Sequence, residues 1–74
     1  MYKYSNINLG KKIKEIRENK NISLEEVAKL SGLHRTTLSI IEKGEMSITL
    51  YSIAMIANAL NVKLSELFKN LENE

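Results

Sequence analysis

The sequence predicts an all-α fold, a bundle of five helices that contains a helix-turn-helix. Three observations support this class. No segment alternates between apolar and polar residues with the period of two that a half-buried strand requires, and proline is absent from all 74 residues. Apolar residues instead recur at intervals of three and four, as they do on one face of a helix. Capping residues and glycines divide these amphipathic segments into short helices.

The five expected helices are short and closely spaced. Their ranges are about 8–20, 24–31, 35–43, 50–60 and 64–71. In the first helix, leucine and isoleucine at positions 9, 13 and 16 share one face. Ser23, followed three residues later by Glu26, forms a capping box that begins the second helix. Gly32 and Gly44 end the second and third helices, because glycine readily adopts the left-handed conformation found at helix C-termini.

The fourth and fifth helices carry most of the remaining apolar residues. Thr49 is the expected N-cap of the fourth helix. The apolar stripe expected on that helix comprises Leu50, Ile53, Ala54, Ala57 and Leu60. The fifth helix starts after Lys63, a poor capping residue, and its apolar residues are Leu64, Leu67, Phe68 and Leu71. Residues 1–74 are expected to form one domain with a modest core, at a size where pairing with a second copy adds stability.

Composition argues against several classes of function. Cysteine is absent, which removes disulfides, thiolate metal sites and cysteine nucleophiles. With one histidine, no glycine-rich phosphate loop and no paired carboxylates, we expect no enzyme, metal, cofactor or small-molecule ligand. No apolar run approaches the roughly 18 residues that span a bilayer. The N-terminus also lacks the apolar segment of a signal peptide, so we expect a cytoplasmic protein without a membrane partner.

Charge is distributed unevenly along the chain. The net charge is +2, but residues 1–43 carry nine Lys and Arg against five acidic residues, whereas residues 44–74 carry two against four. A basic N-terminal half suits a polyanionic partner such as DNA. An ordinary solvated helix surface can carry a similar excess, so charge alone leaves both interpretations open.

The second and third expected helices match the helix-turn-helix pattern. Ala28 is small enough for the third helix to cross the second closely, and Gly32 supplies the turn. The apolar anchors beneath the third helix are Leu33, Leu38 and Ile41. The residues left facing outward in its first two turns are Arg35, Thr36, Thr37 and Ser39. A recognition helix presents its N-terminal residues to base edges in the major groove, and this arrangement fits that task.

The segments SLEEVAKLSGLHRTTLSIIEKG and TLYSIAMIANALNVKLSELF resemble the phage Cro/cI-type (XRE-type) helix-turn-helix regulators. The resemblance covers about residues 9–69 and implies a lambda-repressor-like five-helix bundle. The part LHRT…IEKG is particularly similar to the controller proteins of restriction–modification systems, which are small homodimers that activate or repress their own operon. The resemblance therefore implies a sequence-specific transcription regulator that binds a (pseudo)palindromic operator in double-stranded DNA as a homodimer.

The resemblance also implies roles for individual residues. The base-reading positions fall on Arg35, Thr36, Thr37 and Ser39, with Ile40 nearby. Arginine can donate two hydrogen bonds to guanine O6 and N7, and threonine can bond a base or touch a thymine methyl, although Thr36 and Thr37 can instead cap the helix. The positions expected at DNA phosphates are Ser23, His34, Lys43, Ser47, Thr49 and Arg17. Arg17 and Glu42 match a structural ion pair between the first helix and the end of the third.

The surplus of apolar residues on the last two helices predicts the dimer interface, for which we expect Phe68, Leu71, Tyr51 and Met55. Two positions depart from the family pattern. Leu24 stands where many relatives have a glutamine that contacts phosphate, and Met46 stands where several controller proteins have an arginine or asparagine that probes DNA. Both departures weaken the transfer of any relative's operator sequence to this chain.

Two alternatives compete with the regulator hypothesis. An antitoxin-type or phage-repressor-type helix-turn-helix protein would have another protein as its main partner, but an antitoxin usually adds a toxin-wrapping segment, for which the three residues of ENE leave no room. A purely structural helical bundle would not need Arg-Thr-Thr at an exposed helix start.

Overall fold

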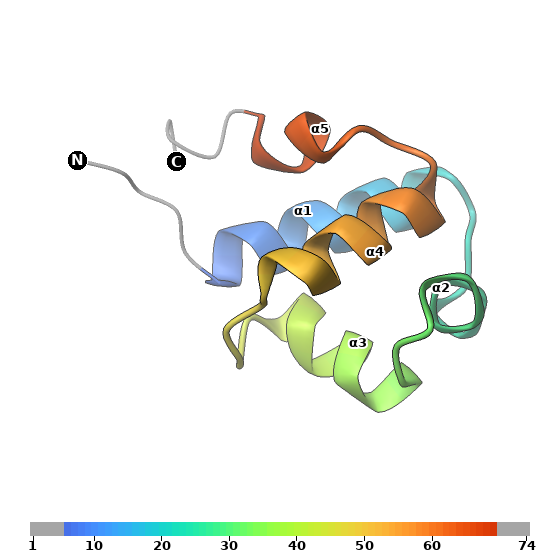
Figure 1. Cartoon of the computed structure of the whole chain (residues 1–74), viewed down its shortest axis with the longest axis horizontal. Coiled ribbons are helices and arrows are strands. Elements are labelled where there is room, and N and C mark those ends of the chain that lie inside the picture. The colour runs from blue at the N-terminus through green and yellow to red at the C-terminus, as the bar shows by residue number, and fades with distance from the viewer. Residues whose placement is uncertain (1–5, 70–74) are drawn as a thin grey trace.

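The computed structural model describes residues 6–69, in which five α-helices and no strand are present (Figure 1). The helices are α1 (Asn6–Asn19), α2 (Leu24–Ser31), α3 (Arg35–Lys43), α4 (Leu50–Leu60) and α5 (Leu64–Phe68). The all-α, five-helix fold class predicted from the sequence is therefore confirmed.

Two helices have bounds that differ from the expected ones. Helix α1 begins at Asn6, earlier than the expected position 8, and ends at Asn19. Helix α5 has only five residues and ends at Phe68, because Lys69 has an extended backbone with φ −64° and ψ 127°. The expected helix to position 71 was therefore too long at its C-terminal end, and Leu71 itself lies outside the described residues.

Side-chain caps fix where α2 and α4 begin. Ser23 Oγ accepts a hydrogen bond of 3.1 Å from the amide of Glu26 at the start of α2. Thr49 Oγ1 accepts one of 3.1 Å from the amide of Ser52 at the start of α4. Each bond satisfies an amide that has no partner inside its own helix. These short helices therefore begin at residues that the sequence itself specifies.

Residues with a left-handed backbone conformation fix where α2, α3 and α4 end. Gly32 follows α2 with φ 79°, and Gly44 follows α3 with φ 75°. Gly44 also allows close packing, since a Cβ atom on it would lie 2.5 Å from the Cα atom of Ile7 in α1. Asn61 ends α4 in the same conformation, with φ 59°, which asparagine tolerates better than most side chains.

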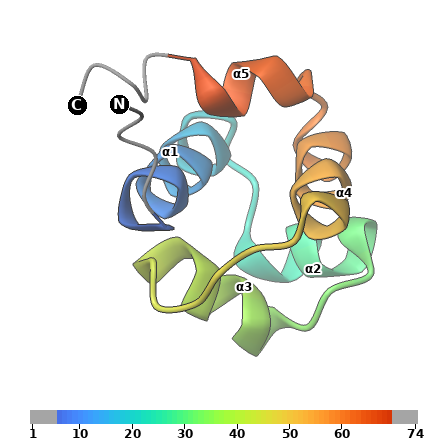
Figure 2. The same cartoon turned by 60° about the vertical axis from the view of Figure 1, so that its left-hand side comes forward.

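The helices surround a single apolar core (Figure 2). The largest fully buried side chains are Ile13, Val27, Leu38, Ile41, Ile56, Leu60 and Leu67, so every helix contributes to it. The expected apolar stripe of α4 was wrong at two positions. Leu50, which the stripe included, is 69% exposed, whereas Ile56, which it left out, is fully buried.

Helix α1 lies directly against the C-terminal end of α3. Gly10 of α1 is buried, and a Cβ atom at this position would overlap the carbonyl oxygen of Ile41 and lie 2.8 Å from that of Glu42. Only glycine therefore allows α1 to approach α3 so closely. The sequence interpretation did not single out this glycine, because nothing in the local pattern of α1 marks the contact.

Candidate nucleic-acid interface

Helices α2 and α3 form the helix-turn-helix, with the turn spanning residues 32–34 (Figure 2). Ser31 stabilises the turn by side-chain hydrogen bonds to a residue of α2 and to a residue of the turn. Its side chain is buried, and its Oγ atom accepts a hydrogen bond of 3.2 Å from the amide of Leu33 and donates one of 3.5 Å to the carbonyl of Ala28. Leu33 and Ala28 both pack against the apolar core. The orientation of α3 relative to α2 is thus fixed by packing and by side-chain hydrogen bonds at the turn.

Helix α3 divides sharply into a buried face and an outward face. Leu38 and Ile41 are at most 1% exposed, and they hold the helix against the core. Arg35, Thr36 and Lys43 are exposed, and Ser39 is half-buried. At 3.6 residues per turn these four positions fall on one side of the helix, opposite Leu38 and Ile41. Their side chains are available to a partner outside the domain.

Thr37 occupies a different position from its neighbours on α3. It is half-buried, whereas Thr36 beside it is exposed. The helical period places Thr37 at the border between the outward face and the face that carries Ile41. The sequence grouped Arg35, Thr36 and Thr37 together, and the structure separates the last of them from the other two.

The residues expected at phosphates are exposed, apart from Arg17. The exposed ones are Ser23, His34, Lys43, Ser47 and Thr49. Ser23 and Thr49 cap α2 and α4, whose first-turn amides attract anions. His34 is the N-cap residue of α3, and its side chain makes no capping hydrogen bond. The phosphate roles of these residues stay predictions.

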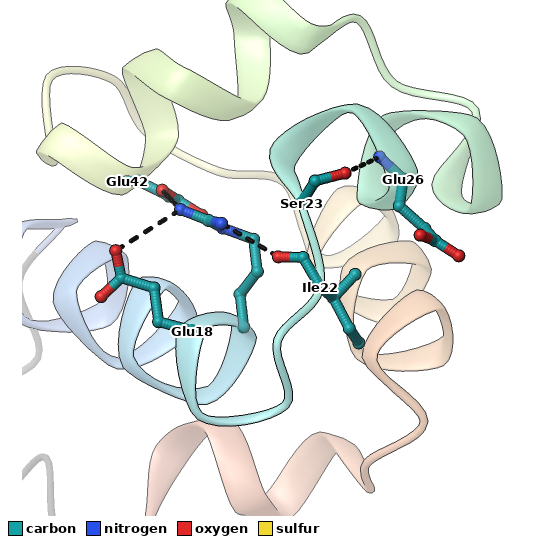
Figure 3. Close-up of polar contacts among 6 residues, drawn as sticks. Glu18, Ile22, Ser23, Glu26 and Glu42 are labelled. Carbon is teal, nitrogen blue, oxygen red and sulfur yellow. Dashed lines mark hydrogen bonds and ion pairs between the residues drawn. The ribbon is translucent and has the colours of Figure 1, made fainter.

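Arg17 is held inside the domain by a network drawn in Figure 3. Its Nε and Nη2 atoms donate hydrogen bonds of 2.7 and 3.1 Å to the two carboxylate oxygens of Glu42, in the last turn of α3. Its Nη1 atom donates one of 3.0 Å to the carbonyl of Ile22, which precedes α2. Arg17 Nη2 also lies 3.9 Å from the carboxylate of Glu18. One guanidinium therefore ties α1 to α3 and to the segment that leads into α2.

The electrostatics of this network favour a permanent charge on Arg17. The hydrogen bonding that Arg17 donates to the Glu42 carboxylate raises the pKa of Arg17 above its ordinary value, against the opposing effect of partial burial. The side chains of Arg17 and Glu42 are 13% and 7% exposed. All three guanidinium nitrogens already bind groups of the domain, so the expected ion pair is present, and the additional phosphate contact of Arg17 stays a prediction.

Comparison with known proteins places this geometry in a family. A family model described as helix-turn-helix matches residues 13–67. The chain belongs to this helix-turn-helix family. The control protein C.SmaI of Serratia marcescens is 35% identical over 68 residues, which span 89% of this chain and 81% of that protein. The control protein C.MunI of a Mycoplasma species is 38% identical over 69 residues, which span 92% and 93% of the two chains.

A solved structure of the helix-turn-helix family has a closely similar fold. The restriction–modification controller protein C.AhdI from Aeromonas hydrophila superposes with a TM-score of 0.83 at 35% sequence identity, over 85% of this chain and 96% of that one. The assignment of the sequence to the XRE-type regulators, with its similarity to controller proteins, is therefore confirmed. This family consists of DNA-binding regulators.

The two departures from the helix-turn-helix family pattern lie in different environments. Leu24, at the start of α2, is half-buried and packs against the core. Met46, in the segment between α3 and α4, is 38% exposed. Leu24 therefore has a structural role in this chain, whereas Met46 remains accessible to a partner but offers no charge or hydrogen-bond donor to DNA.

Two adjacent large apolar side chains of this helix-turn-helix domain are exposed at the start of α4. Leu50 is 69% and Tyr51 is 72% exposed. Met55, one turn after Tyr51, is half-buried, and Phe68 packs partly against the core. Among the described residues expected at the dimer interface, Tyr51 is thus the most accessible. Leu50 joins it as an exposed residue that the sequence interpretation had assigned to the interior.

The described residues contain neither a membrane-spanning helix nor a cluster of metal-ligating side chains. Across residues 6–69, no helix has both the length and the apolar character needed to cross a membrane. Over the same range, no three or more histidine, cysteine, aspartate or glutamate side chains gather where they could hold a metal ion.

Proposed function

We propose that this chain is the controller protein of a restriction–modification system, a sequence-specific transcription regulator that binds its operator as a homodimer. The observation that carries the proposal is the outward face of α3. Arg35 and Thr36 are exposed at its first turn, while Leu38 and Ile41 fix its opposite side in the core. Two relatives that match nearly the whole chain are named control proteins.

In the proposed complex, α3 lies in the major groove with its first turn against base edges. Arg35 donates two hydrogen bonds to a guanine, and Thr36 contacts a neighbouring base or a thymine methyl. Ser39 faces the same groove one turn later, and Thr37 contacts DNA at the edge of the site. Exposed Lys43 and the capped starts of α2 and α4 bind phosphates on either side, which positions the helix without reading sequence.

The proposed dimer places a second copy against the start of α4. Leu50 and Tyr51 are adjacent large apolar side chains that the domain leaves exposed, and Met55 borders them at the next turn. Burial of this surface in a two-fold contact removes it from water and sets the two α3 helices about 34 Å apart, one turn of DNA. Phe68, which packs partly in the core, would lie at the margin of this contact.

Binding measurements on an operator selected from random DNA test the base-reading role of Arg35. The Arg35→Ala variant is expected to lose about 1–3 kcal/mol of operator binding while keeping weak binding to unrelated DNA. Lys63→Ala is the charge-matched control, because Lys63 is exposed and precedes α5, which lies across the bundle from α3 (Figure 1). An equal loss on operator and unrelated DNA in Arg35→Ala would remove the base-reading role.

A further inference from the structure

The side chain of Arg35 has a partner within the domain. Its Nε atom lies 3.8 Å from the Oε2 atom of Glu25, and the two side chains are 62% and 76% exposed. Of the described residues, Glu25 supplies the one carboxylate within ion-pair distance of Arg35. Glu25 is the second residue of α2, so the pair bridges the two helices of the helix-turn-helix close to its outer surface.

The geometry of the pair matters for base recognition. A guanidinium carries five N–H donors in a planar fork, and a contact through Nε leaves the terminal nitrogens able to donate outward. An unrestrained arginine loses side-chain conformational entropy when it is fixed in one orientation. A carboxylate that already restricts the arginine side chain in the free protein reduces the entropy that is lost when the protein binds DNA.

We propose that Glu25 is a positioning residue for base recognition, which holds the Arg35 guanidinium in the orientation that reads guanine. This inference rests on the proposed function and adds a specificity role for a residue of α2. An acidic side chain near DNA phosphates also lowers affinity for any sequence. Glu25 therefore weakens general DNA binding and increases the difference in affinity between the correct and the incorrect base.

Glu26 provides a matched control for this role. It is the next residue of α2, it is also exposed, and its replacement by glutamine removes the same charge from the same helical turn. Within residues 6–69, the carboxylate near Arg35 belongs to Glu25 and not to Glu26. Both substitutions remove one negative charge from the first turn of α2, and glutamine can also fill the capping-box position of Glu26, so the two variants differ in the contact to Arg35.

The test measures dissociation constants by fluorescence anisotropy on two duplexes, the selected operator and the same operator with its conserved G·C pairs replaced by A·T. Discrimination is the ratio of the two constants. Exposed ion pairs contribute little, so Glu25→Gln is expected to lower discrimination by about 1.5- to fivefold. Glu26→Gln should leave discrimination unchanged, and both variants should bind unrelated DNA more tightly at low salt.

A double-mutant cycle separates positioning from direct contact. In an Arg35→Ala background, Glu25→Gln should have no further effect on discrimination, because Glu25 acts through Arg35. Unchanged or increased discrimination in the single Glu25→Gln variant would overturn the proposal, as would an equal loss in the Arg35→Ala background. A wild-type protein that does not distinguish the two duplexes would instead refute the proposed function itself.

Discussion

The ion pair between Arg17 and Glu42 gives the sharpest prediction for stability. We expect Glu42→Ala to lower the free energy of unfolding by about 3–5 kcal/mol, because the change leaves a largely buried guanidinium without its carboxylate. A domain of 74 residues has a typical stability of roughly 4–11 kcal/mol. This single side chain therefore accounts for a large share of the stability of the fold.

The magnitude follows from the geometry of the pair. Glu42 is 7% exposed and accepts two hydrogen bonds, of 2.7 and 3.1 Å, from Arg17. Hydrogen bonds to charged groups each contribute about 1.5–3 kcal/mol, which supports the same total. Because the pKa of Arg17 is raised, its charge stabilises the fold at every pH below its ordinary pKa, and that contribution is lost only as the pH rises through the folded value.

Urea denaturation followed by circular dichroism measures this effect, and Glu18→Ala is the matched control. Glu18 lies 3.9 Å from the same guanidinium but is 58% exposed, so its removal should cost under about 1 kcal/mol. Both variants should retain the wild-type dependence of stability on urea concentration. A loss in Glu42→Ala no larger than that in Glu18→Ala would refute the account of Arg17 as the link between α1 and α3.

Three further predictions concern packing, capping and assembly. Gly10→Ala should destabilise the domain by about 1–3 kcal/mol despite the higher helix propensity of alanine, because the added Cβ overlaps a carbonyl of α3, and thermal unfolding measures this. A melting temperature at or above that of wild type would contradict the close approach of the two helices. Thr49→Ala should cost about 1 kcal/mol by chemical denaturation through loss of the α4 cap, whereas no loss would assign this hydroxyl to another role. Leu50→Glu, at an exposed position, should leave the fold intact and shift the protein toward monomer in sedimentation equilibrium, and a dimer of unchanged stability would place the interface elsewhere.

Local sequence signals explain why much of the fold was predictable. The capping serine at position 23 and the glycine at position 32 act within one turn of their own helix, so the sequence alone located α2 and the turn after it. The buried face of α3 was equally clear, because Leu38 and Ile41 lie three positions apart in a segment whose other residues, except Ile40, are polar. Patterns of this kind need no knowledge of the neighbouring helices.

The sequence failed to predict burial and contacts that depend on neighbouring helices. Helix α4 carries apolar residues on nearly every side, so its period could not distinguish the buried Ile56 from the exposed Leu50. The role of Gly10 depends on the carbonyls of α3, which lie about thirty positions away in the sequence. The pairing of Arg35 with Glu25 likewise depends on how α2 and α3 cross.

The central claim is tested most directly by selecting, from random DNA, the sequences that the wild-type protein binds. The account predicts one enriched sequence with two-fold symmetry, two half-sites about one helical turn apart, and a guanine in each half-site that Arg35 reads. Recovery of random sequences, or of a single half-site without its symmetric partner, would contradict the account of a homodimer that reads its operator through α3.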